Sequence, residues 1–207
     1  EVPRVLEPED DDLQVGIERG FLDLGAEDLR RAEEQVALDV DDGDRRDGAG
    51  ALFPGAVVKI LARHGERLQA EVIGWRRDGL EETLFAQVGK RMPLATLNAA
   101  ATPVETLEET EDPDTGMIWR KVKLAAWTAA TGSYAADAGA LWRYAAQMYD
   151  DACTLCHAAY PPDRYAANDW VGHMNAMRRL TKLTEEEGRL LLAYLQNAAR
   201  DVKGVNL

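Results

Sequence analysis

Cys153, Cys156 and His157 are the residues whose types and spacing point most directly to chemistry. Two cysteines separated by two residues and followed at once by histidine form the attachment motif of c-type haem. The two thiols add to the two vinyl groups of one porphyrin, and the adjoining imidazole reaches the iron from the same face. These are the only two cysteines in the chain. The motif therefore predicts one covalently bound haem c.

Two other kinds of site use a Cys-x-x-Cys pair. A redox dithiol of the thioredoxin type usually opens a helix after a strand, whereas this motif closes a helical pattern. A structural zinc site needs a second pair of ligands, and only His64 and His173 remain as histidines. His64 follows Arg63 and precedes Gly65 in a hairpin-turn sequence, where we expect it to be exposed to solvent. Both interpretations are weaker than covalent haem.

The second axial ligand of the iron must come from elsewhere in the chain or from solvent. Met177, Met174 and His173 lie seven, four and three residues after Trp170 on a predicted helix, so they share one broad face. We predict Met177 as the ligand, with His173, Met174 and an open sixth position as alternatives. Methionines at helical spacing are often core residues instead. A thioether ligand raises the reduction potential, whereas a second imidazole leaves it lower.

The elements that position these residues are predicted to be helices, in residues 133–207. An apolar stripe from Leu141 to Met148 leads directly into the haem motif. Tyr160-Pro161-Pro162 cannot continue a helix, so a loop around the haem edge follows. Helical spacing resumes from Asp169 to Leu180, and Thr184-x-x-Glu187 is a capping box for a last helix. This is the layout of a small all-α cytochrome c domain. The basic residues that are candidates to face the haem propionates are Arg164, Arg178, Arg179 and Lys182.

Residues 51–132 have the pattern of short strands. Strands are predicted at Val57–Ala62, Leu68–Trp75, Thr83–Val88, Met92–Leu97 and Met117–Trp127. Turn sequences separate several of them, at residues 89–91 (GKR) and 112–116 (DPDTG). We therefore expect a small antiparallel β unit, of a kind that can close into a barrel.

Residues 1–50 form an acidic segment with 17 acidic and 6 basic side chains. Two short helices are expected between Leu13 and Val40, and glycines and charges predict a linker over residues 41–50. The net charge of −13 at pH 7 argues against nucleic acid as a partner, because phosphates would be repelled. The expected fold class is α+β, with an acidic, partly helical segment and linker (1–50), a small β domain (51–132) and a mono-haem cytochrome c domain (133–207).

No run of the sequence approaches the ~20 apolar residues of a membrane-spanning helix, and no signal peptide opens the chain. Haem is attached to this motif outside the cytoplasm. We therefore expect a periplasmic location, with a signal or membrane anchor upstream of the sequence shown.

Six stretches that cover most of residues 53–203 are typical of a known family. They are AEVIGWRRDG (Ala70–Gly79), GKRM (Gly89–Met92), IWRKVKLAAW (Ile118–Trp127), LWRYAAQMYDDACTLCHAAYPP (Leu141–Pro162), AANDWVGHMNAM (Ala166–Met177) and LLAYLQNAARD (Leu191–Asp201). Together they resemble the C-terminal part of the pentahaem c-type cytochromes that donate electrons to periplasmic trimethylamine N-oxide and dimethyl sulfoxide reductases. The resemblance implies that Cys153, Cys156 and His157 hold the haem and that Met177 lies on the matching helix.

The resemblance also implies the partners. In that family four membrane-tethered haems take electrons from quinol, whereas this sequence has a single haem motif. The expected donor is therefore an upstream quinol-oxidising multihaem domain or another membrane donor, and the expected acceptor is a periplasmic molybdenum-containing reductase of anaerobic respiration. On this hypothesis the chain is an electron-transfer protein and not an enzyme. The alternative is a haem-based sensor or interaction protein with a weakly held sixth ligand.

Overall fold

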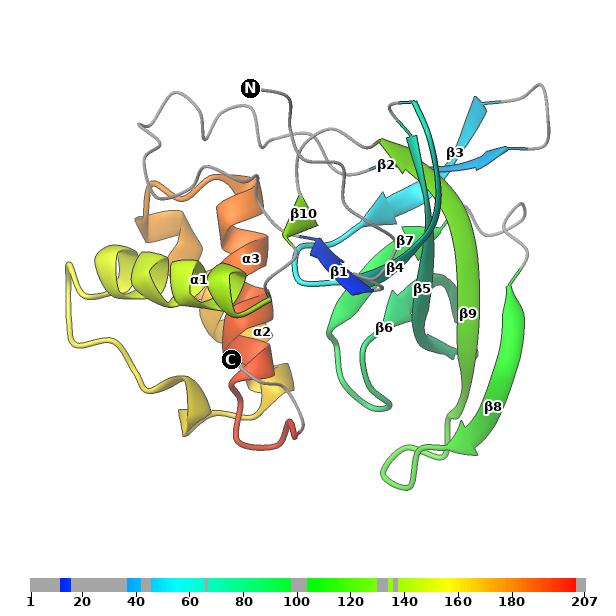
Figure 1. The fold of residues 1–207 in the computed structure, drawn as a ribbon. Helices are drawn as coiled ribbons and strands as arrows, with labels where there is room; N and C mark the ends of the chain where they lie inside the picture. Colours follow the sequence, from blue (N-terminus) through cyan, green and yellow to red (C-terminus); the bar gives the residue numbers. More distant parts are fainter. Residues whose placement is uncertain are drawn as a thin grey trace.

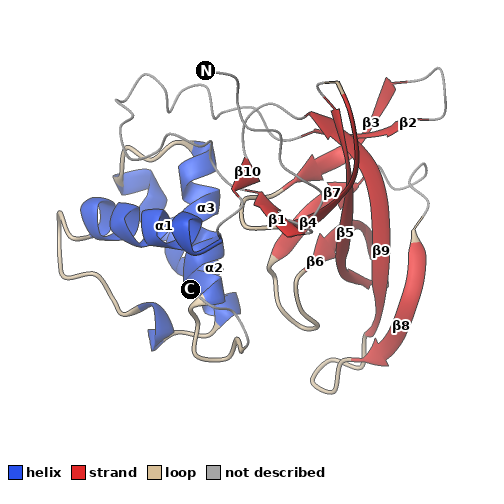
Figure 2. Ribbon diagram, in the orientation of Figure 1, coloured by secondary structure: helices blue, strands red, loops and turns tan. Residues whose placement is uncertain are grey.

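A computed structural model describes residues 12–15, 37–41, 46–65, 67–97, 104–129, 134–135 and 138–203. Most of this part is antiparallel β-sheet, and three short α-helices follow towards its C-terminal end (Figure 1). Figure 2 shows the helices gathered in one group and the strands in another, so the helix that ends at the haem motif lies outside the sheet.

The described strands form one sheet. They are β1 (Asp12–Val15), β2 (Ala37–Asp41), β3 (Arg46–Leu52), β4 (Val57–His64), β5 (Arg67–Arg77), β6 (Leu80–Phe85), β7 (Pro93–Leu97), β8 (Glu105–Glu111), β9 (Ile118–Ala129) and β10 (Tyr134–Ala135). Their order across the sheet is β10-β1-β4-β5-β6-β7-β3-β2-β9-β8. A further pairing joins β5 to β9, so the strands from β5 to β9 in this order close into a ring.

The core of the sheet follows from the two-residue period of β5 and β9. Leu68, Ala70 and Val72 are buried on β5, and the residues between them are more exposed. Across the antiparallel register Val72 faces Leu124 of β9, which is also fully buried. Alternate residues of a strand point to one face, so the two longest paired strands bring one continuous apolar face to the core. His64, at the end of β4, is exposed as predicted.

The predicted fold class, a small β unit followed by an all-α cytochrome c domain, is wrong. The described chain is mostly antiparallel sheet with three short helices. The described residues of the segment 1–50, which we expected to be partly helical, lie in strands β1, β2 and β3. Even the segment 133–207 contributes a strand, β10, which pairs with β1. Residues 16–36, where most of the two predicted N-terminal helices fall, lie outside the described residues.

The physical reason is that distant pairing decides the structure of these segments. β2 pairs with β3 and β9, and β3 also pairs with β7, so their partners lie far along the chain. Strand formation depends on such cross-strand contacts more than on local preference, and the acids and glycines of residues 37–50 gave no alternating pattern. The domain boundaries near residues 50 and 132 stay a prediction.

Strand β8 was also missed, because its sequence ETLEETE carries almost no apolar period. It is held by charge as well as by backbone pairing. Glu105 forms an ion pair with Lys123 at 2.6 Å, and Glu109 forms one with Arg120 at 2.9 Å. Opposite charges facing each other across an antiparallel pair stabilise it modestly. Its four glutamates are exposed, and β8 is the last strand at one edge of the described sheet.

Three helices pack against one another beyond the sheet. They are α1 (Ala138–Cys153), α2 (Ala167–Met177) and α3 (Glu185–Asn197), with the 3₁₀ turns η2 (Pro162–Arg164) and η3 (Arg178–Leu180). The helix predicted to lead into the haem motif and the capped last helix are both confirmed as elements. Their fully buried side chains include Trp142 of α1 and Leu191 and Leu195 of α3. In the described part of the chain, no helix has the length and apolar content needed to span a membrane.

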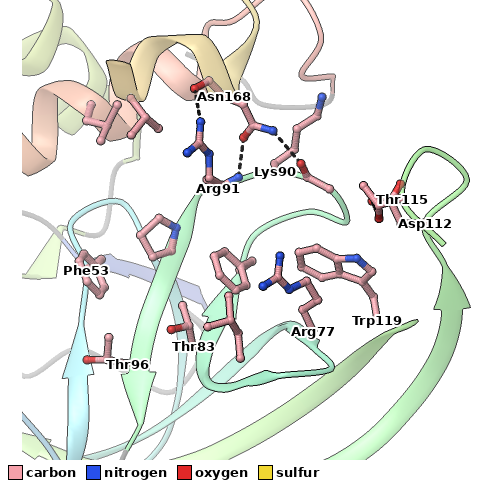
Figure 3. A pocket seen from close by; sticks show the side chains of 16 residues that line it. Phe53, Arg77, Thr83, Lys90, Arg91, Thr96, Asp112, Thr115, Trp119 and Asn168 are labelled. Atoms are coloured by element: carbon pink, nitrogen blue, oxygen red, sulfur yellow. Dashed lines mark hydrogen bonds between the residues drawn. The ribbon is translucent and has the colours of Figure 1, made fainter. Parts of the chain in front are cut away.

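A turn of the sheet docks on the start of α2. The Asn168 amide nitrogen donates a hydrogen bond to the Gly89 carbonyl at 2.8 Å, and its amide oxygen accepts one from the Arg91 backbone N–H at 2.7 Å (Figure 3). The Arg91 guanidinium in turn donates to the Asn168 carbonyl at 3.0 Å. One helical residue thereby fixes both ends of the GKR turn between β6 and β7.

The end of α3 completes this junction. Gln196 is buried, and its amide nitrogen donates to the Arg91 carbonyl at 2.9 Å and to the Ala167 carbonyl at 3.0 Å. Asp201 forms an ion pair with Lys90 and accepts a hydrogen bond from the Ala167 N–H at 2.8 Å. Ala167 is the first residue of α2. The sheet and α3 therefore hold in place the helix that carries the predicted sixth ligand.

Candidate haem-binding site

The haem motif begins where α1 ends. Cys153 is the last residue of the helix and half-buried, whereas Cys156 is exposed, and both are free thiols. The Thr154 hydroxyl donates to the Asp150 carbonyl at 2.6 Å, which holds the first residue after the helix against its last turn. Burial, aided by the negative charge of Asp150, raises the pKa of the Cys153 thiol. Because neither cysteine forms a disulfide bond, both thiols are available for thioether bonds to haem.

The side chain of His157 is exposed, and the backbone carbonyl of the next residue orients its ring. Its Nδ1 lies 2.8 Å from the Ala158 carbonyl oxygen. A carbonyl can only accept a hydrogen bond, so a neutral His157 ring carries its proton on Nδ1 and presents the lone pair on Nε2. A carbonyl on the other ring nitrogen is the usual support of a metal-binding histidine. This arrangement suits His157 to an axial-ligand role.

A cavity of about 720 Å³ brings the motif and α2 together. Both cysteines and His157 line it, and so do His173, Met174 and Met177. Its size lies within the range of about 300–1,000 Å³ found for ligand and cofactor sites. The structure therefore brings the two cysteines, His157 and the three candidate sixth ligands around one space.

The three candidates on α2 differ in their surroundings. Met174 is 6% exposed and belongs to the apolar core of the helices. Met177 is 43% exposed at the cavity. The His173 ring stacks on Tyr165, with ring centroids 4.0 Å apart. Met174 thus already serves as packing and His173 as a stacking partner, whereas the thioether of Met177 has solvent around it.

Aromatic residues for which the sequence predicted no role in the site form one wall of the cavity. Tyr149, Tyr160, Tyr165 and Trp170 all line it. The Tyr149 hydroxyl donates to the Tyr160 carbonyl at 2.9 Å, and the Trp170 indole N–H donates to the Pro162 carbonyl at 2.9 Å. These bonds fasten the loop after the motif to α1 and α2. Helical spacing could have revealed Tyr149, which lies one turn before Cys153 on the same face.

Burial shapes the chemistry of this wall. It raises the pKa of Tyr149 to about 12, with a smaller contribution from the nearby Cys153 thiol. The phenol is therefore neutral at pH 7. Its hydroxyl remains a hydrogen-bond donor to the loop and adds no charge beside the cavity.

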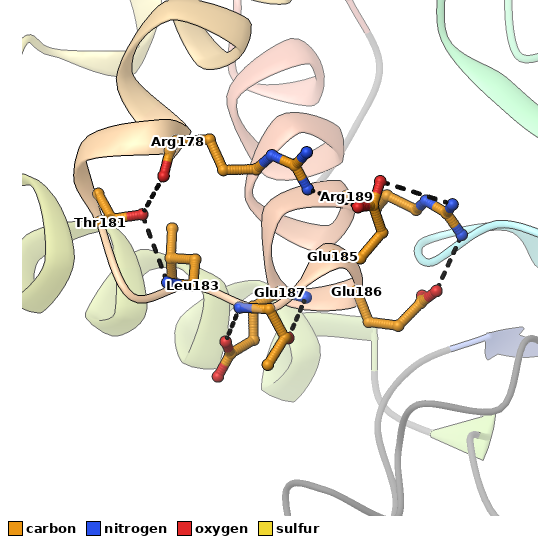
Figure 4. A network of polar contacts seen from close by, with 8 residues as sticks. Arg178, Thr181, Leu183, Glu185, Glu186, Glu187 and Arg189 are labelled. Atoms are coloured by element: carbon orange, nitrogen blue, oxygen red, sulfur yellow. Dashed lines mark hydrogen bonds and ion pairs between the residues drawn. The ribbon is translucent and has the colours of Figure 1, made fainter.

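The basic residues expected near haem propionates have different roles. Arg164 lies over the Tyr160 and Tyr165 rings, 4.7 and 5.6 Å from their centroids. Arg178 forms an ion pair with Glu185 at 3.0 Å, within the polar network at the start of α3 (Figure 4). Among the basic residues predicted for this role, Lys182 lines the cavity. It is the one whose position matches the prediction directly.

These residues fit a c-type haem. The cavity joins two free thiols, an oriented imidazole and a largely apolar, aromatic lining, which is the donor set that covalent haem attachment requires. Two large apolar side chains at its rim, Leu155 and Leu180, are 82% and 75% exposed. Exposed apolar side chains gathered at one site indicate a surface that something covers. A site of this composition defines the class of c-type cytochromes.

Comparison with known proteins adds the family. Residues 27–132 match the family model of the TorC third cytochrome c domain. Over 200 residues the chain is 32% identical to the cytochrome c-type protein TorC of Escherichia coli K12. The aligned region covers 93% of this chain and 51% of that protein. The chain is also 32% identical over 152 residues to the cytochrome c-type protein TorY of Haemophilus influenzae, covering 73% of this chain and 41% of that protein.

The family match covers half of the chain, which therefore belongs to the family of the TorC third cytochrome c domain. The resemblance to the C-terminal part of the pentahaem cytochromes is confirmed. The chain spans about half the length of the curated relatives it matches. The matched range ends before Cys153, so the family match rests on the strands and not on the haem motif. No solved structure matches the chain.

Proposed function

We propose that the chain is a periplasmic electron-transfer module that holds one haem c on Cys153, Cys156 and His157. Its acceptor is a molybdenum-containing reductase of the trimethylamine N-oxide or dimethyl sulfoxide reductase type. The observation that carries the proposal is the single cavity that joins both thiols, the imidazole and the ligand candidates of α2. Membership of a cytochrome c family, with relatives whose names are cytochrome c-type proteins, supports the same class of function.

The residues of the site each have a role in this function. When bound, haem c supplies a one-electron couple between ferric and ferrous iron. The Ala158 carbonyl holds the His157 ring in one orientation, and the Tyr149 and Trp170 bonds keep the surrounding loop closed. The aromatic wall excludes water, which tunes the potential of the couple. The exposed rim around Leu155 and Leu180 is where a redox partner approaches.

Met177 is the proposed sixth ligand. Its side chain lines the cavity and is not committed to the helix core, unlike that of Met174. His157 and Met177 together would occupy both ligand positions of a haem iron, which would supply electron transfer there and leave no position for a substrate. We therefore propose that the chain is not an enzyme. Docking is by a small, transient interface, of less than about 1,200 Å², as is usual for redox encounters.

A matched pair of variants tests the ligand. Met177→Leu and Met174→Leu both conserve side-chain volume and remove the thioether. We expect Met177→Leu to abolish the long-wavelength band of methionine–iron ligation in the oxidised protein and to lower the reduction potential. Met174→Leu should leave both unchanged. The opposite pattern would make Met174 the ligand, and two unchanged spectra would leave neither methionine on the iron.

A kinetic experiment tests the electron-transfer role. The reduced protein is mixed in a stopped-flow instrument with a candidate reductase, with or without trimethylamine N-oxide or dimethyl sulfoxide. We expect rapid oxidation of the haem only when the reductase and its substrate are both present. A haem that stays reduced under these conditions, yet binds carbon monoxide rapidly, would contradict the proposal and favour a sensor.

A further inference from the structure

A second cavity of about 670 Å³ lies between the sheet and the helices (Figure 3). Strands β5, β6 and β9 form one side of it, and Asn168, Val171 and Leu192 contribute from α2 and α3. None of the residues that line it also lines the haem-binding cavity. It is therefore a separate site, on the sheet side of α2.

Two buried donors in this cavity lack acceptors. Within the described part of the chain, neither the Arg77 Nε nor the Trp119 Nε1 has a hydrogen-bond partner. Trp119 is only 4% exposed, so solvent reaches its indole poorly. A buried donor left unpaired is costly, and such groups are nearly always satisfied by some partner. Their presence in the lining of one cavity indicates a ligand that accepts hydrogen bonds.

The two donors belong to side chains at facing positions of neighbouring strands. Arg77 of β5 and Trp119 of β9 are direct partners in the antiparallel register. Side chains at directly opposed positions leave the same face of the sheet with their Cβ atoms about 4.5–5.5 Å apart. The guanidinium and the indole therefore lie next to each other in the lining, as Figure 3 shows for the two side chains.

The charges around the cavity favour an anion. Lys90 and Arg91 line it together with Arg77, and Lys90 forms an ion pair with Asp201. Among the described residues of the lining, Asp112 is the only acidic one. Both oxygens of Asp112 are engaged within its own turn, by the Asp114 N–H at 3.1 Å and the Thr115 hydroxyl at 2.7 Å. With Asp201 on Lys90 included, the three cations still outnumber the two carboxylates, so the cavity keeps a positive balance.

The remaining walls are apolar. Phe85 meets Trp119 edge to face, with ring centroids 5.5 Å apart, and Leu80, Pro93 and Leu192 add aliphatic surface. Apolar walls with a few convergent polar groups are typical of sites for small organic ligands. A guanidinium presents a planar fork of donors that matches the two oxygens of a carboxylate. We propose that this cavity binds a small organic carboxylate, with its head group on Arg77 and Trp119 and its apolar body against Phe85.

Nuclear magnetic resonance of the indole N–H groups tests this in the reduced, haem-loaded chain. Benzoate is the probe, and benzamide is its neutral counterpart of the same shape. Trp119→Phe identifies the Trp119 resonance among the five tryptophans of the chain. We expect benzoate to shift that resonance saturably and benzamide to bind at least about tenfold more weakly, because a charge-assisted hydrogen bond is lost. Equal binding of the two, or no saturable shift, would overturn the proposal.

A charge-matched pair of variants localises the site. Arg77→Gln removes the cavity arginine, and Arg76→Gln removes its neighbour, whose Nε donates to the Glu81 carbonyl and which does not line the cavity. We expect benzoate affinity to fall by about tenfold or more in the first variant and to stay unchanged in the second. Equal losses would show a non-specific charge effect and would refute the site. Inorganic phosphate binding as tightly as benzoate would refute the carboxylate assignment. The haem spectrum should be the same in all variants.

Discussion

Gln196 gives the sharpest test of how the sheet positions the haem-bearing helices. Its side chain is 1% exposed, and one amide nitrogen bridges the Arg91 carbonyl of the sheet turn and the Ala167 carbonyl that begins α2. Gln196→Met keeps the length of the side chain and removes both hydrogen bonds. The Asn197→Met variant is the control, because the Asn197 amide donates only within α3, to Ala193 at 2.8 Å.

The expected loss follows from the two bonds. Each net hydrogen bond contributes about 1 kcal/mol, and a buried carbonyl left unpaired adds roughly 1–3 kcal/mol. We therefore expect Gln196→Met to lower the free energy of unfolding by about 3–5 kcal/mol, a large share of the ~5–15 kcal/mol of a typical domain. Asn197→Met should cost about 1 kcal/mol or less.

The assay is urea denaturation of the haem-loaded protein, followed by far-ultraviolet circular dichroism and by the haem absorbance. The midpoint should fall in Gln196→Met without a change in the denaturant slope. If both variants lose the same free energy, or if Gln196→Met loses less than about 1 kcal/mol, the amide bridge does not hold the junction together.

Three further changes have expected outcomes. Partial burial alone would raise the pKa of Asp201, but the hydrogen bonds from Lys90 and from the Ala167 N–H outweigh it and lower that pKa. Asp201 therefore stabilises the fold above its unfolded-state pKa. This stabilisation is lost as the pH falls through the folded-state pKa. Asp201→Asn should therefore lower the free energy of unfolding at pH 7 and much less at low pH. Urea denaturation midpoints at both pH values measure this difference. An equal loss of free energy at both pH values would contradict the prediction. Thr184→Ala removes the cap that accepts the Glu187 N–H at 3.2 Å and should cost about 1 kcal/mol in thermal or urea unfolding. Tyr149→Phe removes the hydroxyl bond to the loop after the motif and should cost about 1 kcal/mol, with faster amide hydrogen exchange in that loop and unchanged exchange in β5.

The haem motif and the elements around it could be read from the sequence because their signals are local. The apolar stripe before Cys153 and the capping box at Thr184 each act within a few residues, and each corresponds to an observed helix. The prolines after Cys153 predicted a loop, and the structure has a 3₁₀ turn that starts at Pro162. The strands β4, β5, β6, β7 and β9 were likewise predicted by their short apolar runs. The strands β4, β5 and β9 extend beyond the predicted ends, and β6 lies nearer the N-terminus than the predicted Thr83–Val88.

The rest of the fold depends on contacts that no local window contains. The sequence of β8 is almost entirely polar, and only its ion pairs with β9 explain why it is a strand. The GKR turn, Asn168 and Asp201 lie in three separate family-like stretches, and their meeting at one junction was not predictable from spacing. Arg77 and Trp119 became a candidate site only once the register of β5 and β9 placed them opposite each other.

The acidic outer strand has a consequence for how the protein behaves in solution. A strand at the edge of a sheet offers unpaired backbone groups to any other chain, and charged side chains are a common protection against such self-association. Here the four exposed glutamates of β8 provide that protection. Replacing these glutamates with glutamine removes the repulsion between copies, so the variant should aggregate and turn turbid at neutral pH, where the unchanged protein stays clear.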